Sequence, residues 1–216
     1  MKRVALYGLG LIGIALLIGH NVTAENKAAA PAVSPAAQAG APSPEDAAKA
    51  EMMKKWEAVA TPGEEHKRLE PIVGSWTYTM KWWMEPNGQP EQSSGTSENI
   101  WILGGRFVQQ KIAGQSMGQP FEGIGITGYD RIRKEYSGFW IDNMSTTTAA
   151  STAQYDPAAN SLVETGSFAC PMTGETHRQF RAVLKLGDGQ SYTYEMYSKH
   201  TDGTEFKTME ISYVRQ

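Results

Sequence analysis

The chain has 216 residues, with 20 Lys and Arg, 23 Asp and Glu, and a formal net charge of −3. This balance argues against a general binder of nucleic acid or of an anionic membrane, because either would need a clustered basic face. A single cysteine, Cys170, excludes an intramolecular disulfide, so the fold has to rest on its hydrophobic core.

The first 24 residues have the pattern of a secretory signal peptide. Two basic residues follow Met1, residues 4–19 are apolar apart from one tyrosine, and residues 22–24 fit a small-residue cleavage site. The alternative is an uncleaved membrane anchor, but the apolar run is short for a spanning helix. We therefore predict cleavage near Ala24, a periplasmic or secreted location, and no stable membrane insertion afterwards. Removal of residues 1–24 takes away both basic residues and no acid, which leaves a net charge of −5.

Residues 25–42 are mostly Ala, Pro, Ser, Gln and Gly, which is too few large apolar groups to offset the entropy of ordering. We interpret this segment as a disordered tether. Ser43-Pro44-Glu45-Asp46 then has the pattern of a helix start, with a serine cap, a proline in the first turn and acids near the positive end of the helix dipole. Together with a second start at residues 61–64, it predicts N-terminal helices within residues 43–70.

Residues 71–216 change to short segments rich in Trp, Tyr, Phe, Ile and Thr, separated by turn pairs such as Asn87-Gly88 and Asp202-Gly203. This pattern indicates an antiparallel meander. The ten expected strands cover residues 75–84, 94–102, 106–113, 121–128, 135–142, 145–154, 161–168, 178–186, 191–199 and 205–214. An open meander of this size would expose two sheet edges, so we predict an all-β fold, an antiparallel up-and-down barrel.

The last three strands also predict their register. A two-residue turn at Asp202-Gly203 makes one face of the last hairpin consistently apolar. The pairs on that face are Tyr192 with Tyr213, Tyr194 with Ile211, and Met196 with Met209. A bulged loop at Asp188-Gly189 is favoured in the preceding hairpin, because it pairs Leu184 and Ala182 with the same apolar face.

The opposite face of these strands places Glu195 directly across from Glu210. Two facing carboxylates repel and, if buried, would raise one pKa or attract a cation, which would suit acid/base catalysis. On a wet face the charges would instead be screened and balanced by Arg181 and neighbouring lysines. The sequence leaves both interpretations open, as it leaves open which face is the inner one.

Residues for metal binding or covalent catalysis do not fall into a known spacing. His66, His177 and His200 form no metal-ligand pattern, and no G-x-S-x-G nucleophile elbow is present. Cys170 lies in a predicted loop, CPMTGE, with no basic neighbour to lower its pKa. We therefore expect no metal, no cofactor and no catalytic residues.

Gly123, Gly125 and Gly128 have the G-x-G-x-x-G spacing of a dinucleotide-binding loop. Such a loop needs a helix after the glycines and an acidic residue about 20 positions further on. The segment that follows, EYSGFWID, has the composition of a strand instead. We interpret the glycines as positions where a barrel strand bends and packs closely against its neighbours.

The candidate ligand-binding residues are aromatic and polar side chains that could reach a barrel interior. Strict alternation along the first strand places one bulky set on a single face, Trp76, Tyr78, Met80, Trp82 and Met84. This set would either fill the lumen or line an apolar pocket. The predicted ligand-binding residues are Trp76, Tyr78, Trp101, Arg106, Trp140 and Asp142. Arg106 could equally form a structural ion pair that closes one end of the barrel.

Six segments together resemble a bacterial family. They are, in order, GEEHKRLEPIVGSW, WILGGRFVQQ, FEGIGITGYD, FWIDNM, PMTGE and EFKTMEISYVR, within residues 63–215. The family is the domain of unknown function 1579, of calycin-like or lipocalin-like β-barrels. The resemblance implies that fold, with no agreed substrate or catalytic residue. Gly74-Ser75-Trp76 also resembles the lipocalin G-x-W motif, whose tryptophan plugs one barrel end.

These observations predict an exported barrel that binds an apolar or amphipathic small molecule in its lumen, without catalysis. The alternatives are a cofactor-free enzyme that uses Glu195 and Glu210, an envelope interaction module that acts through its outer surface, and a barrel whose side chains fill the lumen. The size of the interior void distinguishes the first from the last, because useful ligand pockets measure about 300 Å³ or more.

Overall fold

The computed structural model describes residues 43–200 and 202–216. The predicted signal peptide and tether, residues 1–24 and 25–42, lie outside the described residues. Three helical segments come first, namely α1 (Pro44–Ala60), α2 (Glu64–Lys67) and the 3-10 helix η1 (Glu70–Ile72). The strands that follow are β1 (Gly74–Trp82), β2 (Glu91–Ile102), β3 (Phe107–Ser116), β4 (Gln119–Asp130), β5 (Glu135–Asp142), β6 (Ala149–Asp156), β7 (Ser161–Phe168), β8 (Arg178–Lys185), β9 (Ser191–Lys199) and β10 (Glu205–Arg215).

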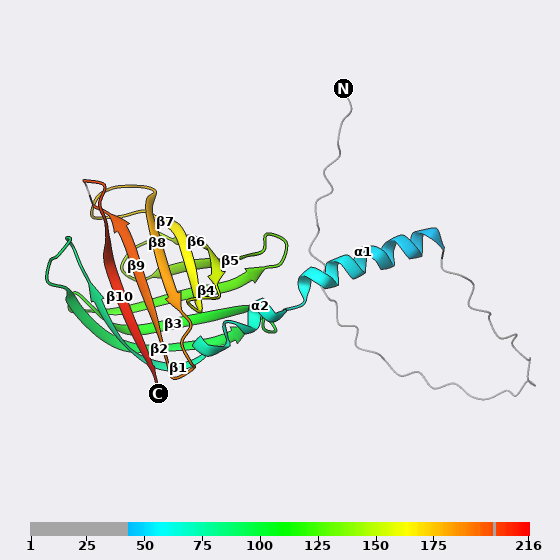
Figure 1. Cartoon of the computed structure of the whole chain (residues 1–216), viewed down its shortest axis with the longest axis horizontal. Coiled ribbons are helices and arrows are strands. Elements are labelled where there is room, and N and C mark those ends of the chain that lie inside the picture. Colours follow the sequence, from blue (N-terminus) through cyan, green and yellow to red (C-terminus); the bar gives the residue numbers. More distant parts are fainter. Residues whose placement is uncertain (1–42, 201) are drawn as a thin grey trace, which may run out of the picture. The chain divides into compact units, whose positions relative to one another are not determined.

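The ten strands form one closed barrel, in which each pairs with its sequence neighbours and β1 pairs with β10 (Figure 1). This confirms the predicted all-β, antiparallel up-and-down barrel. Closure leaves no strand edge without a backbone partner, which is the physical reason that the meander curls up. The first strand is shorter than expected, because β1 ends at Trp82. Met84 therefore lies beyond the strand and is exposed, not on the inner face.

The register of the last three strands follows the apolar pattern. The predicted pairs are present, Tyr192 with Tyr213, Tyr194 with Ile211, Met196 with Met209, Leu184 with Tyr194, and Ala182 with Met196. The last turn differs from the predicted two-residue type, since the backbone N–H of His200 donates to the carbonyl of Thr204 at 2.8 Å. The loop is one residue longer, and a bulge between Lys207 and Met209 absorbs the extra residue.

Helix α1 begins where the cap pattern predicts. The Ser43 hydroxyl accepts a hydrogen bond from the Asp46 backbone N–H at 3.2 Å, and Pro44 occupies the first turn. The helix buries none of its residues, and no helix in the described part of the chain is long and apolar enough to cross a membrane. Near its end, Arg131 donates to the carbonyl of Ala58 at 2.5 Å. A hydrogen bond from the Arg131 side chain to the backbone of α1, rather than a buried apolar face of the helix, thus joins α1 to the barrel.

One end of the barrel is closed by α2, η1 and the start of β1. Leu69 and Trp76 are fully buried there. The Trp76 indole N–H donates to the carbonyl of Ile72 at 2.9 Å, and its ring meets Tyr192 edge-on with 4.8 Å between centroids. The Arg215 guanidinium lies over the same indole, 4.3 Å from its centroid. Trp76 therefore plugs this end, as the lipocalin-like motif implied.

The three spaced glycines lie on β4, and a strand follows them instead of a helix. A Cβ at Gly123 would collide with the indole of Trp140 on β5, and a Cβ at Gly128 would collide with the ring of Phe107 on β3. The glycine spacing therefore reflects close packing against neighbouring rings, which agrees with the structural interpretation.

Candidate functional site

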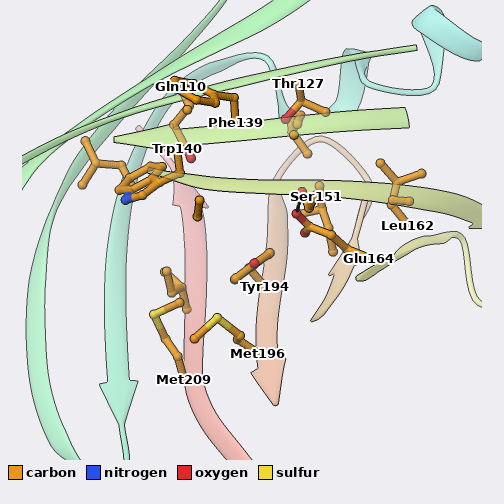
Figure 2. Close-up of a pocket in the computed structure, with 18 of the residues that line it drawn as sticks. Gln110, Thr127, Phe139, Trp140, Ser151, Leu162, Glu164, Tyr194, Met196 and Met209 are labelled. Atoms are coloured by element: carbon orange, nitrogen blue, oxygen red, sulfur yellow. Dashed lines mark hydrogen bonds between the residues drawn. The ribbon is translucent and has the colours of Figure 1, made fainter. Parts of the chain in front are cut away.

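The barrel encloses a cavity of about 440 Å³. This volume lies within the range of about 300 to 1,000 Å³ that is typical of small-molecule pockets. Figure 2 shows side chains from several strands facing this space. Most of the wall is aromatic or aliphatic, and the aromatic members are Tyr78, Phe121, Tyr136, Phe139, Trp140, Phe168, Phe180, Tyr192, Tyr194 and Tyr213. The lumen is therefore open and largely apolar, not filled by its own side chains.

Three of the six predicted ligand-binding residues, Tyr78, Trp140 and Asp142, lie on the lumen wall. The Trp140 indole N–H donates to Asp142 Oδ2 at 2.9 Å, and its ring stacks on Phe121 with 6.4 Å between centroids. The other oxygen of Asp142 accepts from the backbone N–H of Met144 at 3.0 Å. Each carboxylate oxygen of Asp142 thus has a donor from the protein, and the indole orientation is fixed.

The other three predicted residues lie outside the lining. Trp76 lies beneath the lumen as the plug. The Trp101 indole N–H donates to Glu70 Oε2 at 2.8 Å, which ties β2 to η1. Arg106 is exposed, and its guanidinium donates to the carbonyl of Leu103 at 2.9 Å. Arg106 thus stabilises its own turn through a carbonyl rather than through an ion pair that closes the barrel.

The floor of the lumen is a network of neutral polar groups. The side-chain amide of Asn99, which is buried, donates to the carbonyl of Ile72 at 2.7 Å and to the hydroxyl of Tyr192 at 2.9 Å. The Gln110 amide donates to the same hydroxyl at 3.2 Å and to the Ser97 hydroxyl at 3.1 Å. Burial raises the pKa of Tyr192 far above its ordinary value, so the phenol stays neutral.

A carboxyl group that the sequence analysis did not select, Glu164 on β7, also lines the lumen. The Ser151 hydroxyl on β6 donates a hydrogen bond to Glu164 Oε1 (Figure 2). The Tyr194 hydroxyl on β9 also interacts with the Glu164 carboxyl. Burial raises the pKa of Glu164, and these two interactions oppose part of that rise. Burial, followed by the charge of Glu164, raises the pKa of Tyr194 well above its ordinary value.

The predicted register already contained the signal for Glu164. The predicted register placed Ala182 on the apolar face of β8, and Glu164 pairs with Ala182 in the next ladder, so the two side chains share the face that the structure shows to be the inner one. The segment around Leu162 and Val163 has apolar residues on both faces, however, and by itself does not fix which face is inner. Extension of the register by one more strand would have placed Glu164 on the apolar face, which the structure shows to be the inner one.

Glu195 and Glu210 face each other as predicted, and neither lines the lumen. The Lys207 ammonium lies between them, 3.1 Å from Glu195 Oε1 and 2.5 Å from Glu210 Oε2. Burial tends to raise the pKa of Glu195, but hydrogen bonds from Lys207 and Tyr197 and the lysine charge outweigh it and lower that pKa. The pair has the features of an ion-paired cluster on the outer wall.

Cys170 has a basic neighbour, which the sequence did not predict. The Arg178 guanidinium lies 3.8 Å from the Cys170 sulfur. Burial tends to raise the pKa of this thiol, but hydrogen bonds that include those from Thr173 and Arg178 outweigh it and lower the pKa. Within residues 43–200 and 202–216, no group of three or more His, Cys, Asp and Glu side chains could hold a metal ion.

These features define the class of protein, a small closed β-barrel with an internal apolar cavity. The chain belongs to the family described as protein of unknown function (DUF1579), whose model matches residues 61–215. It is similar in fold to Rv2717c from M. tuberculosis, with a TM-score of 0.54 and 15% identity over 72% of this chain and 99% of that chain. A redesigned β-barrel aligns with a TM-score of 0.35 and 15% identity, over 69% and 95% of the two chains. No curated protein matches the sequence.

Proposed function

We propose that this protein is an exported binder of an apolar or amphipathic small molecule, which it holds in the barrel lumen without transforming it. The observation that carries the proposal is the apolar cavity of about 440 Å³. A barrel filled by its own side chains would leave far less space than the roughly 300 Å³ that a useful ligand pocket needs. The signal-peptide pattern of residues 1–24 supports a periplasmic or secreted location.

Two adjacent alanines on β6 provide a matched test. Ala149 lines the lumen, whereas Ala150 is exposed on the other face of the strand. Ala149→Phe should fill part of the cavity, and Ala150→Phe should add the same ring to the outside. The probe is N-phenyl-1-naphthylamine, an uncharged dye that becomes fluorescent in apolar pockets. We expect the wild type and Ala150→Phe to bind it with similar affinity, and Ala149→Phe to bind it at least about tenfold more weakly, because the substituted ring occupies the ligand volume.

A second measurement addresses the natural ligand. Native mass spectrometry of the protein purified from its own cell envelope should detect a co-purifying small molecule that is absent from Ala149→Phe purified in the same way. Equal dye affinity in all three proteins would place the dye outside the lumen and contradict the proposal. The absence of both dye binding and a co-purifying molecule would contradict it as well.

A further inference from the structure

The lumen wall contains acidic side chains but no basic one among its described residues. Its ionisable acids are Glu164 and Asp142, and the described residues of the lining include no lysine, arginine or histidine. A carboxylate or phosphate ligand would therefore meet no positive group in the lining. The side chains of the wall favour a cation over a fatty-acid-like anion.

Glu164 also retains hydrogen-bonding capacity. An ionised carboxylate offers about four acceptor positions, and here one donor comes from Ser151 and another from Tyr194. Asp142 likewise has two protein donors, an indole N–H and a backbone N–H, and the first of them ties it to the Trp140 ring. Glu164 keeps acceptor positions that a ligand N–H can fill.

The surroundings of Glu164 leave space for such a group. A side chain at Gly138 on β5 would collide with Ser151 Oγ and approach Glu164 Oε1 to 3.2 Å, so the glycine keeps this part of the wall open. The residues paired with Glu164 are small, Ala153 on β6 and Ala182 on β8. Small neighbours therefore leave the carboxyl accessible from the lumen.

Aromatic and thioether groups complete the site. Figure 2 shows Tyr194, Met196 and Met209 facing the same space as Glu164. Phe168 and Phe180 line the same cavity, with 6.1 Å between their centroids. Aromatic faces attract cations, and methionine side chains adapt to flexible apolar chains. The wall thus offers contacts to a positive head and to an apolar tail.

We propose that the lumen selects lipophilic amines, whose ammonium group donates hydrogen bonds to Glu164 while the apolar tail packs against Met196 and Met209. This inference rests on the proposed function, since it names the ligand class of the same cavity. The ammonium supplies the positive charge that the lumen lacks and up to three N–H donors. An alcohol of equal length can donate one hydrogen bond but leaves the carboxylate charge uncompensated.

Three probes of equal chain length test the selection, namely octylamine, octanol and octanoate. Each is titrated by its displacement of N-phenyl-1-naphthylamine at pH 7, where the amine is charged and the carboxylic acid is ionised. In the wild type we expect octylamine to bind at least about tenfold more tightly than octanol, and octanoate to bind most weakly. In Glu164→Gln the amine should fall to the affinity of the alcohol, whose own affinity should change little.

The matched control is Glu98→Gln. Glu98 lies on the exposed face of β2, so this change removes the same charge from the outside of the barrel. The amine preference should persist in this variant. Its loss here would attribute the preference to net charge and overturn the role of Glu164.

The pH dependence gives a second readout. The group that faces Glu164 from β9, Tyr194, stays neutral because its own pKa is raised, and β6 and β8 present Ser151, Ala153 and Ala182, which do not titrate. Since burial raises the pKa of Glu164 above its ordinary 4.5, wild-type affinity for octylamine should decline on acidification at a higher pH than an ordinary carboxyl group would cause. Glu164→Gln should show no such decline.

The outcomes separate the inference from the proposed function. If octanol binds as tightly as octylamine, or if Glu164→Gln leaves the amine preference intact, the amine inference is wrong while lumen binding stands. If neither the dye nor any of the three compounds enters the lumen, as judged by equal behaviour of the wild type and Ala149→Phe, the proposed function fails and the inference fails with it.

Discussion

A single buried side chain, Trp76, joins the plug of the barrel to its wall. The indole is fully buried, hydrogen-bonded to Ile72 and packed edge-on against Tyr192. Truncation to alanine would leave a cavity and remove one of the two hydrogen bonds that the Ile72 carbonyl accepts, so Trp76→Ala should reduce the free energy of unfolding by about 3 to 5 kcal/mol. Denaturant midpoints measure the loss.

Trp83, just beyond β1, is the matched control because it is only partly buried and lies beside Lys207, 6.0 Å from the ring centroid. Trp83→Ala should cost about 1 kcal/mol or less. If Trp83→Ala lost more stability than Trp76→Ala, the assignment of Trp76 as the plug would be refuted.

Glu164 makes stability depend on pH in a direction opposite to that of a salt-bridged acid. Burial raises its pKa in the folded state above the ordinary 4.5, so the folded protein holds this proton more tightly than the unfolded chain. As the pH rises from about 4.5 through the raised pKa, ionisation of the buried group removes stability. Glu164→Gln should therefore match the wild type near pH 4 and exceed it in unfolding free energy near pH 8.

The measurement is the difference in urea midpoint between Glu164→Gln and the wild type across this range, with Glu98→Gln as the exposed counterpart. A difference that stayed constant with pH would mean that Glu164 titrates normally in the folded lumen. Only differences between proteins are compared, because other acids contribute to the pH profile of each.

At the scale of strands and turns, three of the six predicted site residues line the lumen and the others lie outside it. Alternation along the first strand selected Tyr78, and the mixed aromatic and polar end of another strand selected Trp140 and Asp142; these three line the lumen. Trp101 and Arg106 were selected because they flank a tight turn, and such a position has the same local pattern whether the side chain faces a ligand or caps its own loop. Only the partners, Glu70 and Leu103, distinguish the two cases, and one of these contacts is remote in sequence.

The bulge in β10 is another feature that the local sequence could not predict, because it depends on contacts between residues far apart in the chain. The hydroxyl of Thr208 donates to the carbonyl of Met196 at 3.2 Å, and its own carbonyl accepts from the backbone N–H of Trp83 at 2.9 Å. The second contact joins segments more than 100 residues apart. A turn pair such as Asp202-Gly203 indicates that a hairpin exists, whereas distant contacts decide its loop length.

Strand β4 provides a prediction at the element scale. A methyl group at Gly123 would collide with the Trp140 indole, whereas at Gly125 the nearest atom of that ring is 3.3 Å away. Gly123→Ala should therefore destabilise the protein by about 1 to 3 kcal/mol, as overpacking does, and Gly125→Ala by less. Gly123→Ala should also weaken dye binding, because Trp140 has to move and it lines the lumen. Equal midpoints for the two variants would show that the indole adapts without cost.

At the scale of the whole molecule, the topology was predictable because closure is the simple way for a long antiparallel meander to satisfy its edges. Turn pairs and the apolar period fixed strand number and order, and the apolar face fixed the register of the last three strands. The volume of the lumen was not predictable. The same bulky residues of β1 could fill or line it, and the difference depends on small residues such as Gly138, Ala153 and Ala182 on distant strands.

The last prediction concerns how much of the chain the barrel needs. The buried hydrophobic residues of the described chain all lie between Leu69 and Tyr213, and α1 contributes none. A chain that begins at Ser43 should therefore melt within about 2 °C of one that begins at Glu25, and one that begins at Thr61 only slightly lower, since it loses the hydrogen bond from Arg131 to the Ala58 carbonyl but no core.

A third chain that begins at Val73 provides the contrast. It lacks Leu69 and Ile72, and it removes the carbonyl that accepts hydrogen bonds from both Trp76 and Asn99. This loss combines core deletion with two unsatisfied buried donors, so it should lower the free energy of unfolding by more than about 3 kcal/mol. Thermal melts of the three chains, monitored by tryptophan fluorescence, measure the series. A large drop already at Ser43 would mean that residues 25–42 pack against the barrel, and a small drop at Val73 would mean that α2 and η1 do not close it.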